Sequence, residues 1–183
     1  MRKPCSLKVF LAAAMLLTVC SCTERDKKSE LPAISGKAGE IAVVATKAQW
    51  EAEPGTSIRA VLAADFPYIP QREPLYRLFN VPHENFNKIF KVHRNIINVK
   101  IADTCKLGIK VLNDIWASPQ TVMLVTAPDE LTAAQFITEN GEKLCSVFRN
   151  AERNRVISNA KAYENKALGE AVAKVYGGSP YFP

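Results

Sequence analysis

The N-terminal segment constrains this chain most, because it decides how much of the sequence is left to fold. Arg2, Lys3 and Lys8 mark its start, and Val9 to Val19 is apolar and uncharged. A membrane-spanning helix needs ~20 apolar residues, whereas the apolar core of an export signal needs only ~7–15. The length therefore favours a signal peptide over residues 1–21. The other interpretation, a short buried helix in a cytosolic domain, would have to place charged residues at both of its ends.

The signal ends in a cysteine with the surroundings of a lipidation site. Leu16 to Cys22 reads Leu-Leu-Thr-Val-Cys-Ser-Cys, the pattern of a bacterial lipobox. Cleavage before Cys22 places the small residue Ser21 at the cut, whereas cleavage before Cys20 would place branched Val19 there. We therefore expect a lipoprotein with acyl chains, such as palmitate, on Cys22. Residues 22–33 are then the lipidated cysteine and a polar tether.

Removing the signal changes the charge of the chain. The precursor has 24 Lys and Arg, 18 Asp and Glu, and a net charge of +6. Loss of Arg2, Lys3 and Lys8 leaves 24 − 3 = 21 basic residues and a net charge of +3. Acids and bases alternate along 149–170, which is typical of a solvated helix face and not of a nucleic-acid-binding stripe. We expect no nucleic-acid partner.

Two of the five cysteines are left for the mature domain. Cys5 and Cys20 leave with the signal and Cys22 takes lipid, so Cys105 and Cys145 remain. In an oxidising envelope these two could form a disulfide. Cys145 also lies in an apolar helical phase with Leu144, which is typical of a buried free thiol. Both interpretations stay open.

Residues 34–183 predict one α+β domain whose periodicity changes near Asp129. Before that point short apolar runs alternate with helical patterns, and after it the pattern is helical. We expect a mixed or mainly antiparallel sheet of about five strands, with helices packed on one face and a long C-terminal helical segment. The expected strands are 40–46, 75–81, 96–101, 108–116 and 120–126, and the expected earlier helices are 57–64 and 85–91.

Four blocks in the same order resemble a known family. They begin at Leu31, Pro70, Lys91 and Asp114, and read LPAISGKAGEI, PQREP, KVHRNI and DIWASPQ. The chain is similar to the N-terminal half of a Bacteroidota lipoprotein family of unknown function, domain-of-unknown-function family 4837. Members of that family continue into a further C-terminal half, so 34–183 would be a truncated family domain. The resemblance implies an envelope location and carries no catalytic residues.

One group of residue types points to a ligand. Cationic, aromatic and amide side chains could together bind a glycan acid, a phosphate or a peptide carboxylate. The opposing interpretation has Trp116 packed in the core and Arg94 paired with Glu73 or Asp114. His83 and His93 are the only histidines, and their spacing matches no metal motif, so we expect no metal site. The candidate ligand-binding residues are Arg72, Lys91, His93, Arg94, Trp116 and Gln120.

Two functions remain open at this stage. The first is a non-enzymatic binding or assembly module, held at a membrane by its lipid and contacting an envelope protein or glycan. The second is a periplasmic or cell-surface hydrolase of glycan or peptide, with His93 as its base. We expect no cofactor for either. Thr23 follows Cys22 in place of the aspartate expected for inner-membrane retention, which favours the outer membrane.

Overall fold

The computed structural model describes residues 31–178 of the 183-residue chain. Residues 32–178 belong to one compact unit. The expected signal peptide, Cys22 and most of the tether lie outside the described residues. The expected domain start at residue 34 falls two residues after the beginning of this unit.

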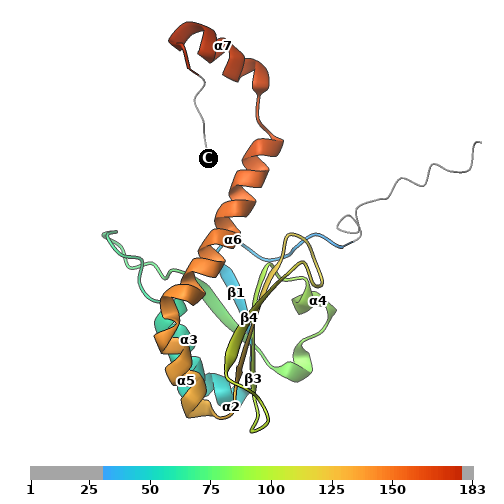
Figure 1. The fold of residues 1–183 in the computed structure, drawn as a ribbon, viewed down its shortest axis with the longest axis vertical. Coiled ribbons are helices and arrows are strands. Elements are labelled where there is room, and N and C mark those ends of the chain that lie inside the picture. Colours follow the sequence, from blue (N-terminus) through green and yellow to red (C-terminus); the bar gives the residue numbers. More distant parts are fainter. Residues whose placement is uncertain (1–30, 179–183) are drawn as a thin grey trace, which may run out of the picture. The chain divides into compact units, whose positions relative to one another are not determined.

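The chain alternates strands and helices and then becomes helical, as the sequence predicts (Figure 1). The strands coincide with the five expected segments to within a few residues. Helix α3 covers most of the first expected helix and begins four residues earlier, α2 before it was not expected, and the expected helix at 85–91 is one turn long. In chain order the elements are β1 (Glu40–Val44), α2 (Lys47–Glu51), α3 (Glu53–Leu62), β2 (Arg77–Val81), the 3-10 helix η2 (His83–Asn85), α4 (Lys88–Lys91), β3 (Asn95–Ile101), β4 (Gly108–Asn113), β5 (Thr121–Ala127), α5 (Glu130–Glu139), α6 (Gly141–Ala162) and α7 (Lys166–Tyr176).

The five strands form one mixed sheet in the order β2-β1-β3-β5-β4. Neighbours β2, β1, β3 and β5 run parallel, and only β4 is antiparallel to its neighbour β5. The α+β class and the mixed sheet that the sequence left open are therefore confirmed. Because four strands run the same way, their starts meet at one edge of the sheet, which we call the amino edge.

One face of the sheet packs against the long helices. Alternating strand residues point toward it, because successive side chains of a strand lie on opposite faces. Tyr76 closes the core: its ring lies edge-on to Phe148, 6.2 Å between centroids, and its hydroxyl donates to the Cys145 carbonyl at 3.2 Å. Burial raises the pKa of Tyr76 to about 12. Buried on this side are Ile41, Val43, Ile58, Leu62, Ile97, Val99, Met123, Val125, Ile137, Leu144 and Phe148.

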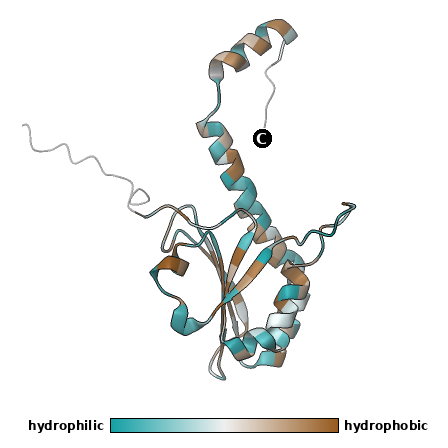
Figure 2. Cartoon of the chain, turned by 180° about the vertical axis from the view of Figure 1, so that it is seen from behind, coloured by the Kyte–Doolittle hydropathy of each residue, from teal (hydrophilic) through white to brown (hydrophobic). Residues whose placement is uncertain are grey.

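The opposite face has a smaller core. Val44, Val81, Ile96 and Val122 are buried there, with aromatic side chains packed against them from the segment between β2 and β3. Short α4 lies on this side, while α3, α5 and the first half of α6 lie on the other (Figure 1). Hydrophobic residues follow the strands through the centre of the domain (Figure 2).

The C-terminal helical segment changes character along its length. In α6, Leu144, Cys145 and Phe148 are buried, whereas residues after Ile157 are exposed. Helix α7 starts at the N-cap Asn165 and ends at Gly177, which has a φ of 74° that suits glycine. Hydrophobic residues recur on α7 (Figure 2). Within residues 31–178, no helix combines the length and the apolar character needed to cross a membrane.

Candidate functional site

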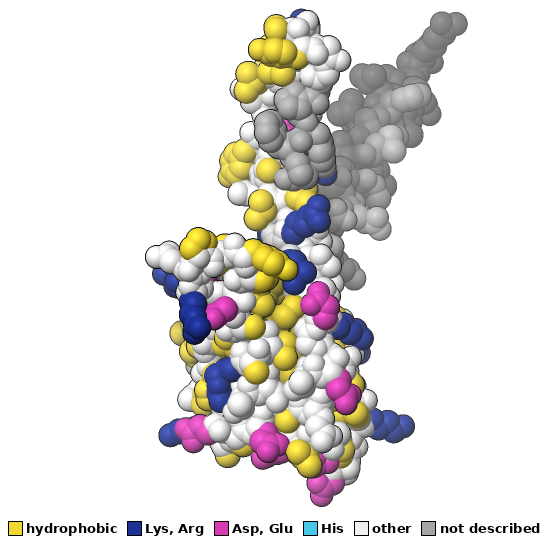
Figure 3. Space-filling model, turned by 90° about the vertical axis from the view of Figure 1, so that its left-hand side faces the viewer, with side chains coloured by type: hydrophobic (Ala, Val, Ile, Leu, Met, Phe, Trp, Pro, Cys, Tyr) yellow, Lys and Arg dark blue, Asp and Glu magenta, His cyan; other side chains and the backbone are white. Residues whose placement is uncertain are grey.

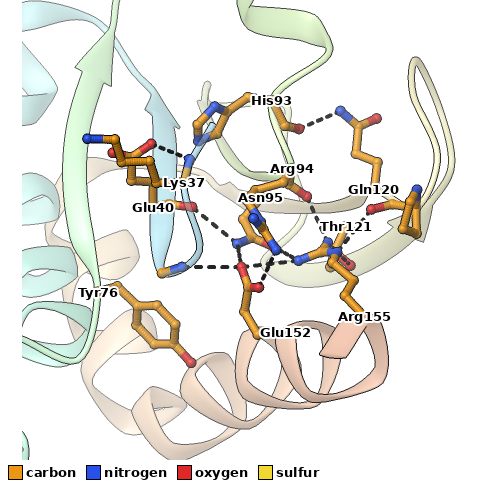
Figure 4. Close-up of polar contacts among 12 residues, drawn as sticks. Lys37, Glu40, Tyr76, His93, Arg94, Asn95, Gln120, Thr121, Glu152 and Arg155 are labelled. Carbon is orange, nitrogen blue, oxygen red and sulfur yellow. Dashed lines mark hydrogen bonds and ion pairs between the residues drawn. The ribbon is translucent and has the colours of Figure 1, made fainter. Parts of the chain in front are cut away.

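The polar residues that the structure brings together lie at the amino edge, where α6 passes the starts of β1, β3 and β5. Asn95 is the first residue of β3 and is in register with Thr121, the first residue of β5. From α6, Glu152 and Arg155 reach this edge one helical turn apart, on one face of the helix. Figure 4 shows their side chains pointing toward Arg94 and Asn95.

Glu152 is the centre of the group. One carboxylate oxygen accepts from Arg94 Nη2 at 2.6 Å. The other accepts from Asn95 Nδ2 at 2.7 Å and lies 3.2 Å from Arg155 Nη1. The Glu152 side chain is only 17% exposed, and those of Arg94 and Arg155 are 15% and 9% exposed. We call these four residues the Glu152 clamp.

Arg155 uses its remaining donors on the sheet. Its Nη1 donates to Asn95 Oδ1 at 2.9 Å, its Nη2 to the Arg94 carbonyl at 2.9 Å and its Nε to the Pro119 carbonyl at 3.0 Å. Burial lowers the pKa of Arg155, and the neighbouring Glu152 carboxylate opposes that shift. The guanidinium therefore joins α6 to β3 and to the loop before β5.

The Glu152 clamp connects α6 to the sheet and is not an open binding site. Both carboxylate oxygens are engaged, and Asn95 Nδ2 also donates to the Glu40 carbonyl at 3.1 Å. Charges removed from water are tolerated when they are paired and hydrogen-bonded in this way. An incoming anion would have to displace Glu152 from both arginines.

His93 is buried beside the clamp and faces away from it (Figure 4). It is 5% exposed, and its ring lies edge-on to Phe79 with 5.1 Å between centroids. Burial lowers the pKa of His93 and so favours the neutral ring, while the nearby Glu40 carboxylate opposes this shift. Within residues 31–178, His93 Nε2 and Arg94 Nε are the two buried side-chain nitrogen or oxygen atoms that have no hydrogen-bond partner.

Gln120 holds the backbone of the neighbouring candidate residues. Its Nε2 donates to the carbonyls of Lys91 at 2.6 Å and His93 at 2.7 Å. Its Oε1 accepts from the Trp116 amide at 3.0 Å. The Lys91 ammonium lies 5.9 Å from the ring centroids of both Phe86 and Trp116, within the range of a cation–π contact. Gln120 is thus a buried structural residue.

The structure brings five of the six candidate residues together and leaves Arg72 out. Arg72 lies in the loop before β2, with its side chain 91% exposed and 3.7 Å from Asp65. The carboxylate partner of Arg94 is Glu152, which the sequence did not suggest. Asn95, Glu152 and Arg155 were also missed. The one available signal was the spacing of Glu152 and Arg155, which places them on one face of a polar helix.

Other reactive groups lie apart from the clamp. Cys105 is half-buried and Cys145 is buried, and both thiols are free. Cys145 Sγ lies 3.6 Å from the Val61 carbonyl, and burial raises the pKa of this thiol. Across the described part of the chain, no three His, Cys, Asp or Glu side chains are grouped to hold a metal ion. A shallow pocket between α3 and α5, which Glu53 and Glu139 help to line, contains none of the candidate residues.

Comparison with known families gives one match. The family described as Domain of unknown function (DUF8532) matches residues 34–161. The chain belongs to the DUF8532 family. The expectation of a family of unknown function is confirmed, and the family is DUF8532 instead of family 4837. No curated protein and no solved structure matches the chain.

The DUF8532 match covers the whole sheet and the clamp. It extends from before β1 to residue 161, the penultimate residue of α6. All four clamp residues and all of the candidate ligand residues lie inside this range. Helix α7 follows it.

Proposed function

We propose that this DUF8532 protein is a lipid-anchored envelope lipoprotein whose domain is a non-enzymatic binding or assembly module. The proposal rests on which polar side chains are paired and which apolar side chains are exposed. The buried charges are paired with one another in the Glu152 clamp, while large apolar side chains are left in solvent. Exposed among them are Phe66, Tyr68, Leu168, Val175 and Tyr176.

The lipobox supports the anchor. In the proposed mature protein Cys22 carries the lipid and the polar residues after it lead to the folded unit at Pro32. The outer membrane is the proposed location, because Thr23 follows the lipidated cysteine. The bacterial lineage proposed from the four sequence blocks is Bacteroidota.

Burial of His93 speaks against the hydrolase alternative. A general base must lie within hydrogen-bond reach of a substrate proton, directly or through one water. His93 is instead enclosed by Phe79 and by the backbone at Gly36, and it does not line the shallow pocket between α3 and α5. We therefore propose the binding module alone.

The anchor is tested by labelling cells with a palmitate analogue. Cys20→Ala should keep the label and the processed size, whereas Cys22→Ala should lose the label and accumulate precursor, because the acyl chain is attached to the thiol of Cys22. Both variants change one cysteine of the same segment, so they are matched. Label that persists in Cys22→Ala would contradict the anchor.

The module is tested by complementation of a deletion strain. His93→Gln keeps a polar side chain of similar size but cannot act as a base, so the envelope phenotype of the deletion should be restored in full. Circular dichroism and thermal unfolding of the purified variant check that it is folded. A folded His93→Gln protein that fails to complement would overturn the non-enzymatic proposal.

A further inference from the structure

The N-terminal segment enters the domain at the amino edge. The Pro32 carbonyl accepts from the Ser118 amide at 3.0 Å, in the loop just before β5. Ser35 then pairs with the start of β3: its amide donates to Val92 and its carbonyl accepts from Arg94. An anchor at Cys22 is therefore connected to the domain through its amino edge.

An apolar loop projects from the same edge. Residues 65–74 follow α3 and return to β2, whose first amide, at Arg77, donates to the Gly39 carbonyl. Asp65 and Pro74 form the base of the loop through an isolated antiparallel bridge. At its tip Tyr68 is fully exposed and has a φ of 72°, which side chains rarely adopt. Phe66 and Ile69 beside it are also exposed.

The C-terminal helices leave the domain from this edge as well. Arg155 of α6 donates to Pro119, next to the Ser118 that binds Pro32. Only seven residues of α6 follow Arg155, which corresponds to ~10 Å at 1.5 Å per residue. Helix α7 begins four residues later, after the connection 163–165.

Helix α7 has two distinct faces. Glu170 and Lys174 lie four residues apart along one face. The other face carries Leu168, Val172, Val175 and Tyr176, of which Leu168, Val175 and Tyr176 are 61%, 73% and 81% exposed. Figure 3 shows hydrophobic side chains on this segment, at the top of the view. An exposed apolar stripe opposite a charged face is typical of a helix that lies in a membrane interface.

Exposed charges are distributed unequally between the two ends of the strands. Exposed cations near the amino edge are Lys37 before β1, Arg77 in β2 and Arg153 in α6, and the 65–74 loop adds Arg72 together with the exposed acids Asp65 and Glu73. At the carboxyl ends of the strands and the helix ends beside them, the exposed lysines Lys47, Lys100 and Lys106 are outnumbered by exposed acids, at Glu51, Glu53, Glu84, Asp103, Asp129 and Glu130. On the surface drawn in Figure 3, most acids lie toward the end away from α7. The cationic edge is complementary to anionic lipid headgroups.

We propose that the amino edge of the domain rests on a bilayer that carries anionic phospholipids. The tip of the 65–74 loop and the apolar stripe of α7 lie at the boundary between headgroups and acyl chains, and the surrounding cations face the headgroups. This inference rests on the lipid anchor proposed above. The ten residues from Cys22 to the folded unit span at most ~35 Å, so the anchor permits this contact without imposing it.

The test uses tryptophan fluorescence of the purified lipoprotein in vesicles of phosphatidylethanolamine and phosphatidylglycerol with brominated acyl chains, which quench only tryptophan that reaches them. Tyr68→Trp and Tyr176→Trp place the probe on the loop and on α7. Lys47→Trp, at an exposed position of α2 near the carboxyl end of β1, is the matched control. The wild-type chain, with Trp50 and Trp116, provides the background.

We expect both Tyr variants to lose the fluorescence added by the new tryptophan, and Lys47→Trp to keep it. Vesicle flotation separates the two proposals: a chain that does not float has no lipid anchor, and both proposals fail. A chain that floats while Tyr68→Trp and Tyr176→Trp are not quenched keeps the anchor and overturns the membrane contact. The new tryptophan of Tyr176→Trp could instead be shielded from water without being quenched by bromine, to an extent that depends on protein concentration. That result would identify a second copy or a protein partner on α7, and it would also overturn the membrane contact.

Discussion

At the scale of single residues, Glu152 makes the ion pairs and the hydrogen bond that connect α6 to the sheet. Glu152→Ala leaves two poorly exposed guanidinium groups without their carboxylate and removes the acceptor of Asn95. Breaking a buried ion pair by removing one partner costs about 3–5 kcal/mol, because the other charge stays buried and uncompensated. We expect the free energy of unfolding, measured by urea denaturation, to fall by that amount.

Glu142→Ala is the matched control on the same helix. Glu142 also pairs with an arginine, Arg149, but at 3.7 Å and with both side chains more than half exposed. Water screens such a pair, so its loss should change the unfolding free energy by less than about 0.5 kcal/mol. Equal losses for Glu152→Ala and Glu142→Ala would contradict the role of the clamp.

Two glycines before β1 provide a second comparison between matched residues. Gly36 and Gly39 both have positive φ, 88° and 76°. A Cβ at Gly36 would lie 2.1 Å from His93 Cε1, whereas a Cβ at Gly39 would meet nothing within 4 Å.

Gly39→Ala should lower the free energy of unfolding by about 1–2 kcal/mol from backbone strain alone. Gly36→Ala should cost about 1–3 kcal/mol more, since the His93 ring must move. Thermal unfolding of the two variants side by side measures the difference, and equal costs would show that the ring is loosely packed.

At the scale of elements, local patterns predicted the strands well and the short helices poorly. Ile97, Val99 and Ile101 alternate clearly, so β3 was expected within one residue of its observed bounds. Helix α2 was missed, because its five residues contain no apolar repeat and it depends on the capping box of Thr46 and Gln49. The parallel pairing of β1 with both β2 and β3 could not be derived either, because strand order depends on long-range packing and leaves no local periodicity.

Helix α7 is the element whose stability depends least on the domain. It has 11 residues, and isolated helices shorter than ~12–15 residues are marginal in water. Its large side chains are mostly exposed, so little apolar burial supports it. For the protein in detergent-free solution we expect amides of 166–176 to exchange hydrogen rapidly, while those of β3 and β5 exchange slowly. Hydrogen–deuterium exchange with mass spectrometry measures both, and slow exchange in α7 would show that it packs more firmly than its exposure indicates.

At the scale of the whole molecule, the candidate site was only half visible in the sequence. Lys91 to Asn95 are adjacent in the chain, so their cationic and amide character could be read directly. Glu152 and Arg155 lie about sixty residues further on, and their approach to Asn95 follows from the path of α6 across the amino edge. The sequence shows the cations without their carboxylate, so an anion site stayed open beside the interpretation that Arg94 is paired within the fold; in the folded chain Glu152 is that partner.

The pH dependence of stability is a property of the whole fold and depends on His93. Burial holds the pKa of His93 below its ordinary value of 6.5, while in the unfolded chain the ring titrates near that value. Between the two values the unfolded chain binds a proton that the folded chain does not, so the free energy of unfolding decreases as the pH falls through this window. Above 6.5 the ring is neutral in both states and the stability is fully present.

Urea denaturation at a series of pH values should show this decrease for the wild type and for His83→Gln, whose histidine is exposed, and a smaller decrease for His93→Gln. Parallel curves for His93→Gln and the wild type would mean that His93 takes up its proton without unfolding the domain.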